Sequence, residues 1–139
     1  GDAMTCRVMM VDDNDNDLLF TRLMLERSGC GFDVIGFERA AEALAYLRDT
    51  PAHGVSIILL DINMPVMNGF DFLQAFEALE PAARGSTVVL MLSSSSDPAD
   101  RDRAARHASV RGYLTKPLDR QVAAALPVLA GLAPGVQPV

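Results

Sequence analysis

Acidic residues and a lysine follow apolar runs in this chain, at positions where side chains can do chemistry. Asp61 closes one short apolar run, Asp12 and Asp13 close an earlier one, and Lys116 comes just after a third. A carboxylate at the end of a buried strand is costly unless it has a binding partner or a function. Three acids and one lysine at such positions predict a magnesium-assisted phosphoryl site with Asp61 as the nucleophile.

The residue types suit this chemistry. An aspartate can accept a phosphoryl group as an acyl phosphate if the attack is in line and charge is neutralised. Magnesium prefers oxygen ligands and keeps several waters, so a few carboxylates suffice. We expect Asp12, Asp13 and Asp61 to supply them, with the backbone carbonyl of Asn63 as a further ligand.

A helix cap is the alternative role for Asp12 and Asp13. Acids and amides before a helix accept backbone N–H groups and interact favourably with the helix dipole. Asn14 or Asp15 can cap the following helix alone. The two acids at the strand end are therefore not needed for capping.

Two further residues complete the predicted phosphoryl site. Ser93 follows an apolar run, so its hydroxyl can donate to a phosphoryl oxygen, although the serines after it also fit a flexible loop. Lys116 can pair with a phosphoryl oxygen or with Asp61, although a lone lysine is more often a solvated surface charge. Pro117 favours a role for Lys116 in the site because it fixes the turn that directs the lysine side chain. The sequence does not decide whether the Lys116–Pro117 bond is cis.

Apolar runs alternate with helical patterns along the chain, which implies a parallel sheet covered on both faces. The expected strands are 7–11, 32–36, 56–60, 87–92 and 112–114. The expected helices lie between Leu18 and Ser28, between Ala41 and Thr50, between Phe72 and Pro81, after Pro98, and from Asp119 to about Leu129. In such sheets ligands bind beyond the carboxyl ends of the strands, where the acids, Ser93 and Lys116 fall.

Composition narrows the function. The 139 residues suit one domain, expected over 5–130, and residues 131–139, with two glycines and two prolines, suggest a flexible tail. A net charge of −6 without a basic stripe argues against binding of nucleic acid. No apolar run approaches the roughly 18 residues that a membrane span needs, and the start lacks a signal-peptide pattern. The two cysteines match no metal spacing, so we expect a cytoplasmic protein with reduced thiols.

Four segments in this order resemble the receiver domains of two-component response regulators, the CheY-like family. They are Val11–Asn14, Asp61–Gly69, Ser93 after its strand, and Gly112–Pro117. The resemblance covers residues 5 to 130. It implies an α/β fold with a doubly wound, five-stranded parallel sheet in the flavodoxin-like order 2-1-3-4-5, flanked by five helices.

The resemblance also implies roles for the site residues. Asp12, Asp13 and Asp61 would bind Mg²⁺, and Asp61 would accept phosphate from a histidine kinase or a histidine phosphotransfer protein. Ser93 and Lys116 would hold the phosphoryl group. Tyr113 would be the aromatic switch residue, with a merely half-buried ring as the alternative. Asn68 and Ser109 depart from the family pattern but do not belong to the site.

Two other functions use the same fold or the same chemistry. Phosphatases of the haloacid-dehalogenase type need a second acid two residues after the nucleophile, where this chain has Asn63. We therefore expect no enzyme, only slow self-dephosphorylation. A phosphorylation-independent interaction module is the other alternative, and the intact set of acids with Lys116 argues against it.

The last predicted helix lacks polar side chains from Val122 to Ala130. A helix that is apolar all round usually buries its second face. We expect a homodimer or protein-partner surface beside Tyr113, with a small exposed alanine-rich face as the alternative. Pro127 is expected to end this helix near Leu126 unless it kinks it. We see no output domain, so the chain is expected to act on a separate protein target, as a single-domain regulator or as a piece of a longer protein.

Overall fold

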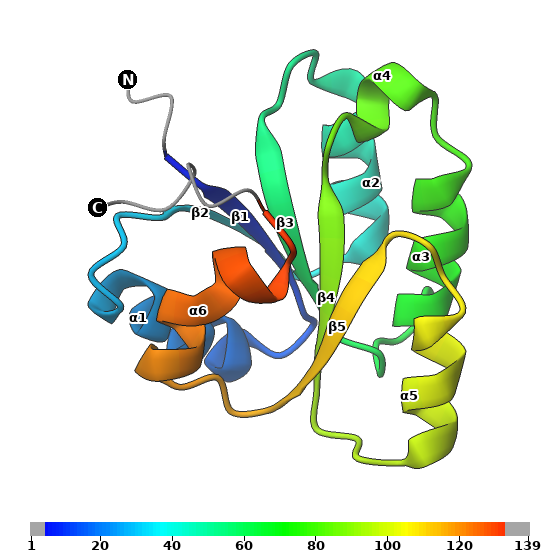
Figure 1. Cartoon of the computed structure of the whole chain (residues 1–139). Coiled ribbons are helices and arrows are strands. Elements are labelled where there is room, and N and C mark those ends of the chain that lie inside the picture. Colours follow the sequence, from blue (N-terminus) through cyan, green and yellow to red (C-terminus); the bar gives the residue numbers. More distant parts are fainter. Residues whose placement is uncertain (1–4, 133–139) are drawn as a thin grey trace.

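The computed structural model describes residues 5–132, which form five strands and six helices (Figure 1). The strands are β1 (Arg7–Val11), β2 (Asp33–Phe37), β3 (Val55–Leu60), β4 (Val88–Ser93) and β5 (Val110–Thr115). The helices are α1 (Asp15–Arg27), α2 (Ala40–Asp49), α3 (Gly69–Glu77), α4 (Pro81–Arg84), α5 (Pro98–Ala105) and α6 (Arg120–Leu129).

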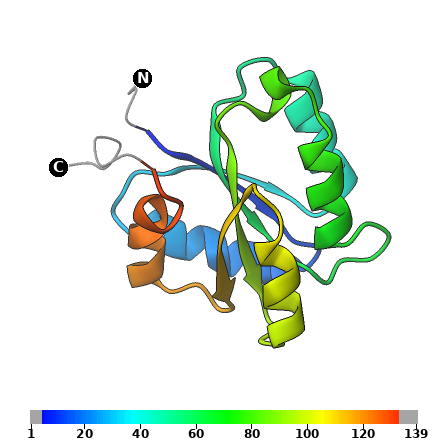
Figure 2. The same cartoon turned by 45° about the vertical axis from the view of Figure 1, so that its right-hand side comes forward.

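The strands form one parallel sheet in the order β2-β1-β3-β4-β5, which confirms the expected topology. Helices α1 and α6 pack against each other on one face of the sheet (Figure 2). Helices α2 and α3 pack against each other on the other face, together with α5. The expected α/β fold is therefore confirmed, with one helix more than expected.

The core consists of two apolar clusters, one on each face of the sheet, because successive side chains of a strand point to opposite faces. In β3, Ile58 and Leu60 belong to the cluster under α2 and α3, and Ile57 and Leu59 to the cluster under α1 and α6. All four side chains are nearly inaccessible to solvent. Burial of each contributes roughly 1.5–3 kcal/mol, so the strands of the site rest on a rigid base.

The additional helix, α4, is a single turn that begins at Pro81. Proline fits the first turn of a helix because its ring presets the backbone angle and its missing N–H has no helical acceptor there. The buried His53 ring accepts the Val55 N–H (3.0 Å) and donates to the Ala83 carbonyl (2.6 Å). Together these two bonds hold α4 against the start of β3, at the end of the sheet away from the strand-end acids.

Helix α6 differs from the expectation in two ways. Pro127 does not end it, because the helix continues to Leu129 and the Ala130 N–H still donates to the Leu126 carbonyl (2.8 Å). The other difference is that α6 does not lie beside Tyr113. That ring packs in the cluster on the opposite face, whereas Leu126 of α6 belongs to the cluster shared with α1.

The outer side of α6 is apolar and open. The exposed fraction is 60% for Val128 and 42% for Leu129. A dimer or partner surface on α6 stays a prediction. After the helix, the Leu132 N–H donates to the Pro127 carbonyl (2.9 Å) and its side chain packs on the core, while the rest of the expected tail lies outside the described residues. Within residues 5–132, no helix has both the length and the apolar character needed to cross a bilayer.

Gly69 allows α3 to begin directly against the end of β3. Its N–H donates to the Ile62 carbonyl (2.8 Å), which brings the two backbones together. A Cβ atom at this position would collide with the Asp61 carbonyl oxygen and would lie 2.9 Å from the Ile62 Cα. Both obstacles are backbone atoms, so a side chain at position 69 displaces the peptide that follows Asp61.

We predict that Gly69→Ala lowers the free energy of unfolding by about 1–3 kcal/mol, because a rigid backbone must move to make room for the methyl group. Urea unfolding at equilibrium measures this change. Gly36→Ala is the matched control, since a Cβ there meets mainly the end of the flexible Met10 side chain at 3.1 Å. An effect of Gly69→Ala no larger than that of Gly36→Ala contradicts the prediction.

Candidate functional site

The predicted site residues meet at the carboxyl edge of the sheet, next to the point where the strand order reverses between β1 and β3. Backbone hydrogen bonds across neighbouring strands fix their positions. The Asp61 N–H donates to the Val11 carbonyl (3.0 Å), and the Lys116 N–H donates to the Ser93 carbonyl (2.9 Å). An open depression of about 340 Å³ lies over this edge, lined by Asp12, Asp13, Asn14, Asp17, Asp61, Asn63, Ser94 and Lys116.

Asp12, Asp13 and Asp61 form a cluster of carboxylates. Each offers an oxygen, and these oxygens all lie within 4.8 Å of one another. Asp12 and Asp61 are buried, and Asp13 is exposed. Three hard oxygen donors around an open space suit a hard divalent cation such as Mg²⁺, which keeps part of its water shell. The cluster therefore fits the predicted metal, and Asn63 lies at the rim of the same depression.

Burial and charge act together on these acids. Burial, and then the negative charge of Asp12, raise the pKa of Asp61 to about 6, against the opposing effect of Lys116. Burial also raises the pKa of Asp12, although hydrogen bonds from Lys116 and from the Asn14 N–H oppose it. Ionisation of each carboxylate therefore carries a free-energy penalty that comes mainly from burial, and a bound dication would relieve it.

Lys116 is placed opposite the acids by the end of β5, and its peptide bond to Pro117 is cis. Its Nζ lies 2.6 Å from Asp12 Oδ2, 2.7 Å from Asp17 Oδ2 and 3.6 Å from Asp61 Oδ1. Burial lowers the pKa of Lys116, but the hydrogen bonds to Asp12 and Asp17 outweigh burial, so the pKa is raised. The lysine therefore stays charged in the site.

Asp17 is a member of the site that the sequence analysis did not identify. Asn14 is the N-cap of α1, and its side chain accepts the Asp17 N–H (3.0 Å). This cap starts the helix directly after the strand-end acids, so its first turn faces the end of β5. The available signal was an acid three residues after a capping asparagine, and such an acid usually only favours the helix dipole.

Ser93 does not line the depression. It is fully buried, and its Oγ accepts the Ser95 N–H (3.1 Å). Because Oγ acts as acceptor in this bond, the hydroxyl hydrogen remains available for an incoming acceptor. Ser94 is the serine that lines the depression.

Ser95 connects Ser93 to Tyr113. Its backbone carbonyl accepts the Tyr113 hydroxyl (2.8 Å), and its own hydroxyl donates to Asp100 in α5 (2.7 Å). The Arg101 guanidinium lies 4.6 Å from the centre of the Tyr113 ring. A short chain of contacts thus runs from the end of β4 to the surface of α5.

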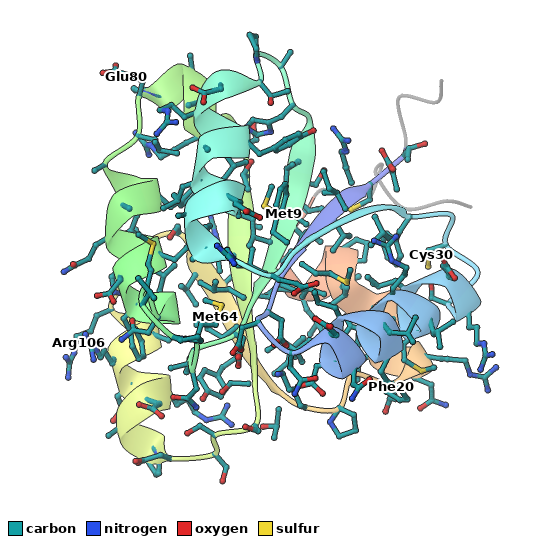
Figure 3. The ribbon with its side chains drawn as sticks, turned by 180° about the vertical axis from the view of Figure 1, so that it is seen from behind. Met9, Phe20, Cys30, Met64, Glu80 and Arg106 are labelled. Carbon is teal, nitrogen blue, oxygen red and sulfur yellow. The ribbon has the colours of Figure 1, made fainter. Side chains whose placement is uncertain are left out.

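The structure brings the acids Asp12, Asp13 and Asp61 together with Lys116. Ser93 lies behind this group. Tyr113 is linked to Ser93 through Ser95. The segment from Asp61 to Gly69 also reaches into the core, where Met64, labelled in Figure 3, is buried.

Comparisons with known proteins agree with this fold. A family model of the response regulator receiver domain matches residues 8–126. The two-component response regulator ORR1 of Oryza sativa subsp. japonica is 31% identical over 117 residues, which cover 81% of this chain and 49% of that protein. The sensor histidine kinase GacS of Pseudomonas protegens is 29% identical over 128 residues, which cover 91% of this chain and 13% of that protein. The chain thus spans about half the length of the first relative and a small part of the second.

Solved structures are similar over almost the whole chain. A response regulator receiver protein from Dyadobacter fermentans gives a TM-score of 0.81 at 29% identity, covering 93% of this chain and 100% of that one. A two-component response regulator from Cytophaga hutchinsonii gives 0.79 at 28% identity, covering 91% and 95%. Because the family model matches most of its length and the solved structures share its fold, the chain belongs to the response regulator receiver domain family.

Proposed function

We propose that this chain is a phospho-acceptor signalling switch in which Asp61 takes a phosphoryl group from a histidine kinase or a histidine phosphotransfer protein. The observation that carries the proposal is the position of Asp61, a buried carboxylate between Asp12 and Lys116 whose pKa is raised to about 6. An acid held there at such expense of stability has a chemical role rather than a structural one.

The residues of the site divide the work of the transfer. An Asp61 oxygen forms a bond to phosphorus as the bond from phosphorus to the donor imidazole nitrogen breaks. That nitrogen keeps the bonding electron pair, and the imidazole leaves neutral because its other ring nitrogen carries the proton. Asp12, Asp13, Asp61 and the backbone carbonyl of Asn63 would hold Mg²⁺, which offsets the negative charge of the acids and of the phosphoryl oxygens. Lys116 supplies a positive charge from the protein itself, which would pair with a phosphoryl oxygen.

Ser93 and Tyr113 would carry the signal outward. A phosphoryl group adds about −1.5 to −2 charge and strong acceptor oxygens, toward which the free hydroxyl hydrogen of Ser93 can turn. If the whole Ser93 side chain moves toward the phosphoryl group, its Oγ leaves the Ser95 N–H, which would shift the Ser95 carbonyl that holds Tyr113. The surface of Tyr113 and α5 is therefore where we place the contact with a downstream protein target.

We predict that acetyl phosphate with Mg²⁺ adds one phosphoryl group to the protein and that Asp61→Asn abolishes this labelling. The reason is that an amide oxygen carries no charge and cannot form the acyl phosphate. Intact-protein mass spectrometry measures the product, and chelation of Mg²⁺ should remove it as well.

Asp102→Asn is the matched control, because Asp102 is an exposed aspartate of α5 and should be dispensable for labelling. Transfer from a panel of histidine kinases extends the test to the natural donor. If neither acetyl phosphate nor any kinase labels the wild-type protein, the switch is excluded and a phosphorylation-independent interaction module takes its place.

We also predict that Asp61→Asn stabilises the metal-free protein at pH 7.5 by about 1–3 kcal/mol. The folded-state pKa of Asp61 is raised from 3.8 to about 6, so its protonated form is the one that folding favours. That contribution is fully present below about pH 4 and is lost as the pH rises through 6. The asparagine mimics the protonated acid and keeps the contribution at every pH.

Unfolding by urea in the presence of a chelator, at a series of pH values from 4 to 8 (a range set by these pKa values), measures the difference between the two proteins. The stability gap should open between pH 4 and pH 6 and then level off. Added Mg²⁺ should close it by stabilising the wild type more. A gap that is constant over this range, or of opposite sign, would refute the assignment.

A further inference from the structure

The Lys116 ammonium has three carboxylate neighbours at unequal distances. Asp12 and Asp17 lie at 2.6 and 2.7 Å, whereas the Asp61 oxygen lies at 3.6 Å. Hydrogen bonds between N–H and oxygen fall at about 2.7–3.2 Å, so Asp61 is outside this range. The lysine that would hold a phosphoryl group therefore rests on two other acids and not on the phosphoacceptor.

The contact with Asp17 is built into the local backbone. The Asn14 N–H donates to Asp12 Oδ1 (3.0 Å), and the Asn14 side chain accepts the Asp17 N–H (3.0 Å). The three residues thus form one hydrogen-bonded unit from the end of β1 to the first turn of α1. Asp17 is not a member of the carboxylate cluster that suits a cation, so its position opposite Lys116 is not explained by metal binding.

The two acids that hold Lys116 differ in exposure. The side chain of Asp17 is 42% exposed, against 9% for Asp12 and 14% for Lys116. If Lys116 leaves Asp17, water can solvate the freed carboxylate at small cost. If it leaves Asp12, a buried charge loses its cation, which is far more costly. Asp17 is therefore the acid that Lys116 can leave.

We propose that Asp17 is a positioning residue that holds the Lys116 ammonium away from Asp61 and competes with the phosphoryl group for it. The proposal rests on the function proposed above. Asp17 is not one of the three clustered carboxylates, and its effect on the phosphoryl group would be exerted through Lys116. When the phosphoryl group is on Asp61, the ammonium exchanges the Asp17 carboxylate for a phosphoryl oxygen, so the pair with Asp17 weakens retention of the phosphoryl group.

Asp17→Ala, compared with Asp15→Ala, tests this role. Both acids belong to the first turn of α1, so each variant loses one charge and one favourable interaction with the helix dipole. Asp15 neighbours Glu38 instead of Lys116. We expect Asp17→Ala to bind beryllofluoride, a phosphoryl mimic, about three-fold more tightly than the wild type at saturating Mg²⁺, as expected for loss of a half-exposed ion pair. Asp15→Ala should bind as the wild type does.

A second measurement needs neither metal nor phosphoryl mimic. The Hε and Cε resonances of Lys116, assigned with Lys116→Arg, should shift in metal-free Asp17→Ala and stay unchanged in Asp15→Ala. Equal affinity of Asp17→Ala and Asp15→Ala for beryllofluoride overturns the proposal, and so does an unchanged lysine resonance. If the wild type binds no beryllofluoride, the proposed function fails and this proposal fails with it. If the wild type binds beryllofluoride and Asp17→Ala has no effect, only the positioning role of Asp17 is refuted.

Discussion

Repulsion among confined carboxylates is the constraint on which the rest of this structure depends. Four acids, Asp12, Asp13, Asp17 and Asp61, face the single ammonium of Lys116, so the formal charge of the group is −3. In water such a group would separate. Here the strand ends hold it together. Burial, and then the negative charge of Asp12, raise the pKa of Asp61, which reflects the free-energy cost of ionising it there. A divalent cation would lower this repulsion and a phosphoryl group would add to it, so the two proposed ligands would act on the site in opposite directions.

The remaining architecture keeps these charges in place. Two buried clusters fix the sheet on both faces, and its ladder sets the register of the strand ends. Gly69 lets α3 begin against the peptide after Asp61, and Asn14 starts α1 directly after the acids. The burial of the apolar core thus stabilises the folded state enough to offset the unfavourable crowding of charges at the carboxyl edge of the sheet.

The sequence predicts much of this arrangement because the ends of buried parallel strands can be recognised in it. An apolar run followed by Asp61, Asp12 or Lys116 marks a point where a buried strand stops, and a parallel sheet gathers such points on one edge. The sheet order followed from the resemblance to receiver domains rather than from periodicity. Strand and helix boundaries agree with the structure to within a few residues, and β1 agrees throughout.

The contacts that were not predicted depend on how helices and strand faces are oriented in space, which the order of residues along the chain does not specify. Asp17 meets Lys116 only because the first turn of α1 faces β5, a relation across 99 positions of the chain. Tyr113 lies on the opposite sheet face from α6 because neighbouring strand positions alternate, so nearness in sequence placed them together wrongly. Pro127 stays within α6 because the hydrogen bonds around it are kept in the last turn.

The backbone bonds between neighbouring strand ends have a consequence for how such a protein can diverge. Asp61 is tied to β1 and Lys116 to β4 through the ladder, so their separation cannot change without disturbing the sheet. Asp17 is carried by a helix, and an exchange there alters the surroundings of the lysine while every strand stays where it is. If Asp61 carries a phosphoryl group as proposed, a substitution in α1 can therefore change the lifetime of that group while the strands that position the reacting atoms stay unchanged.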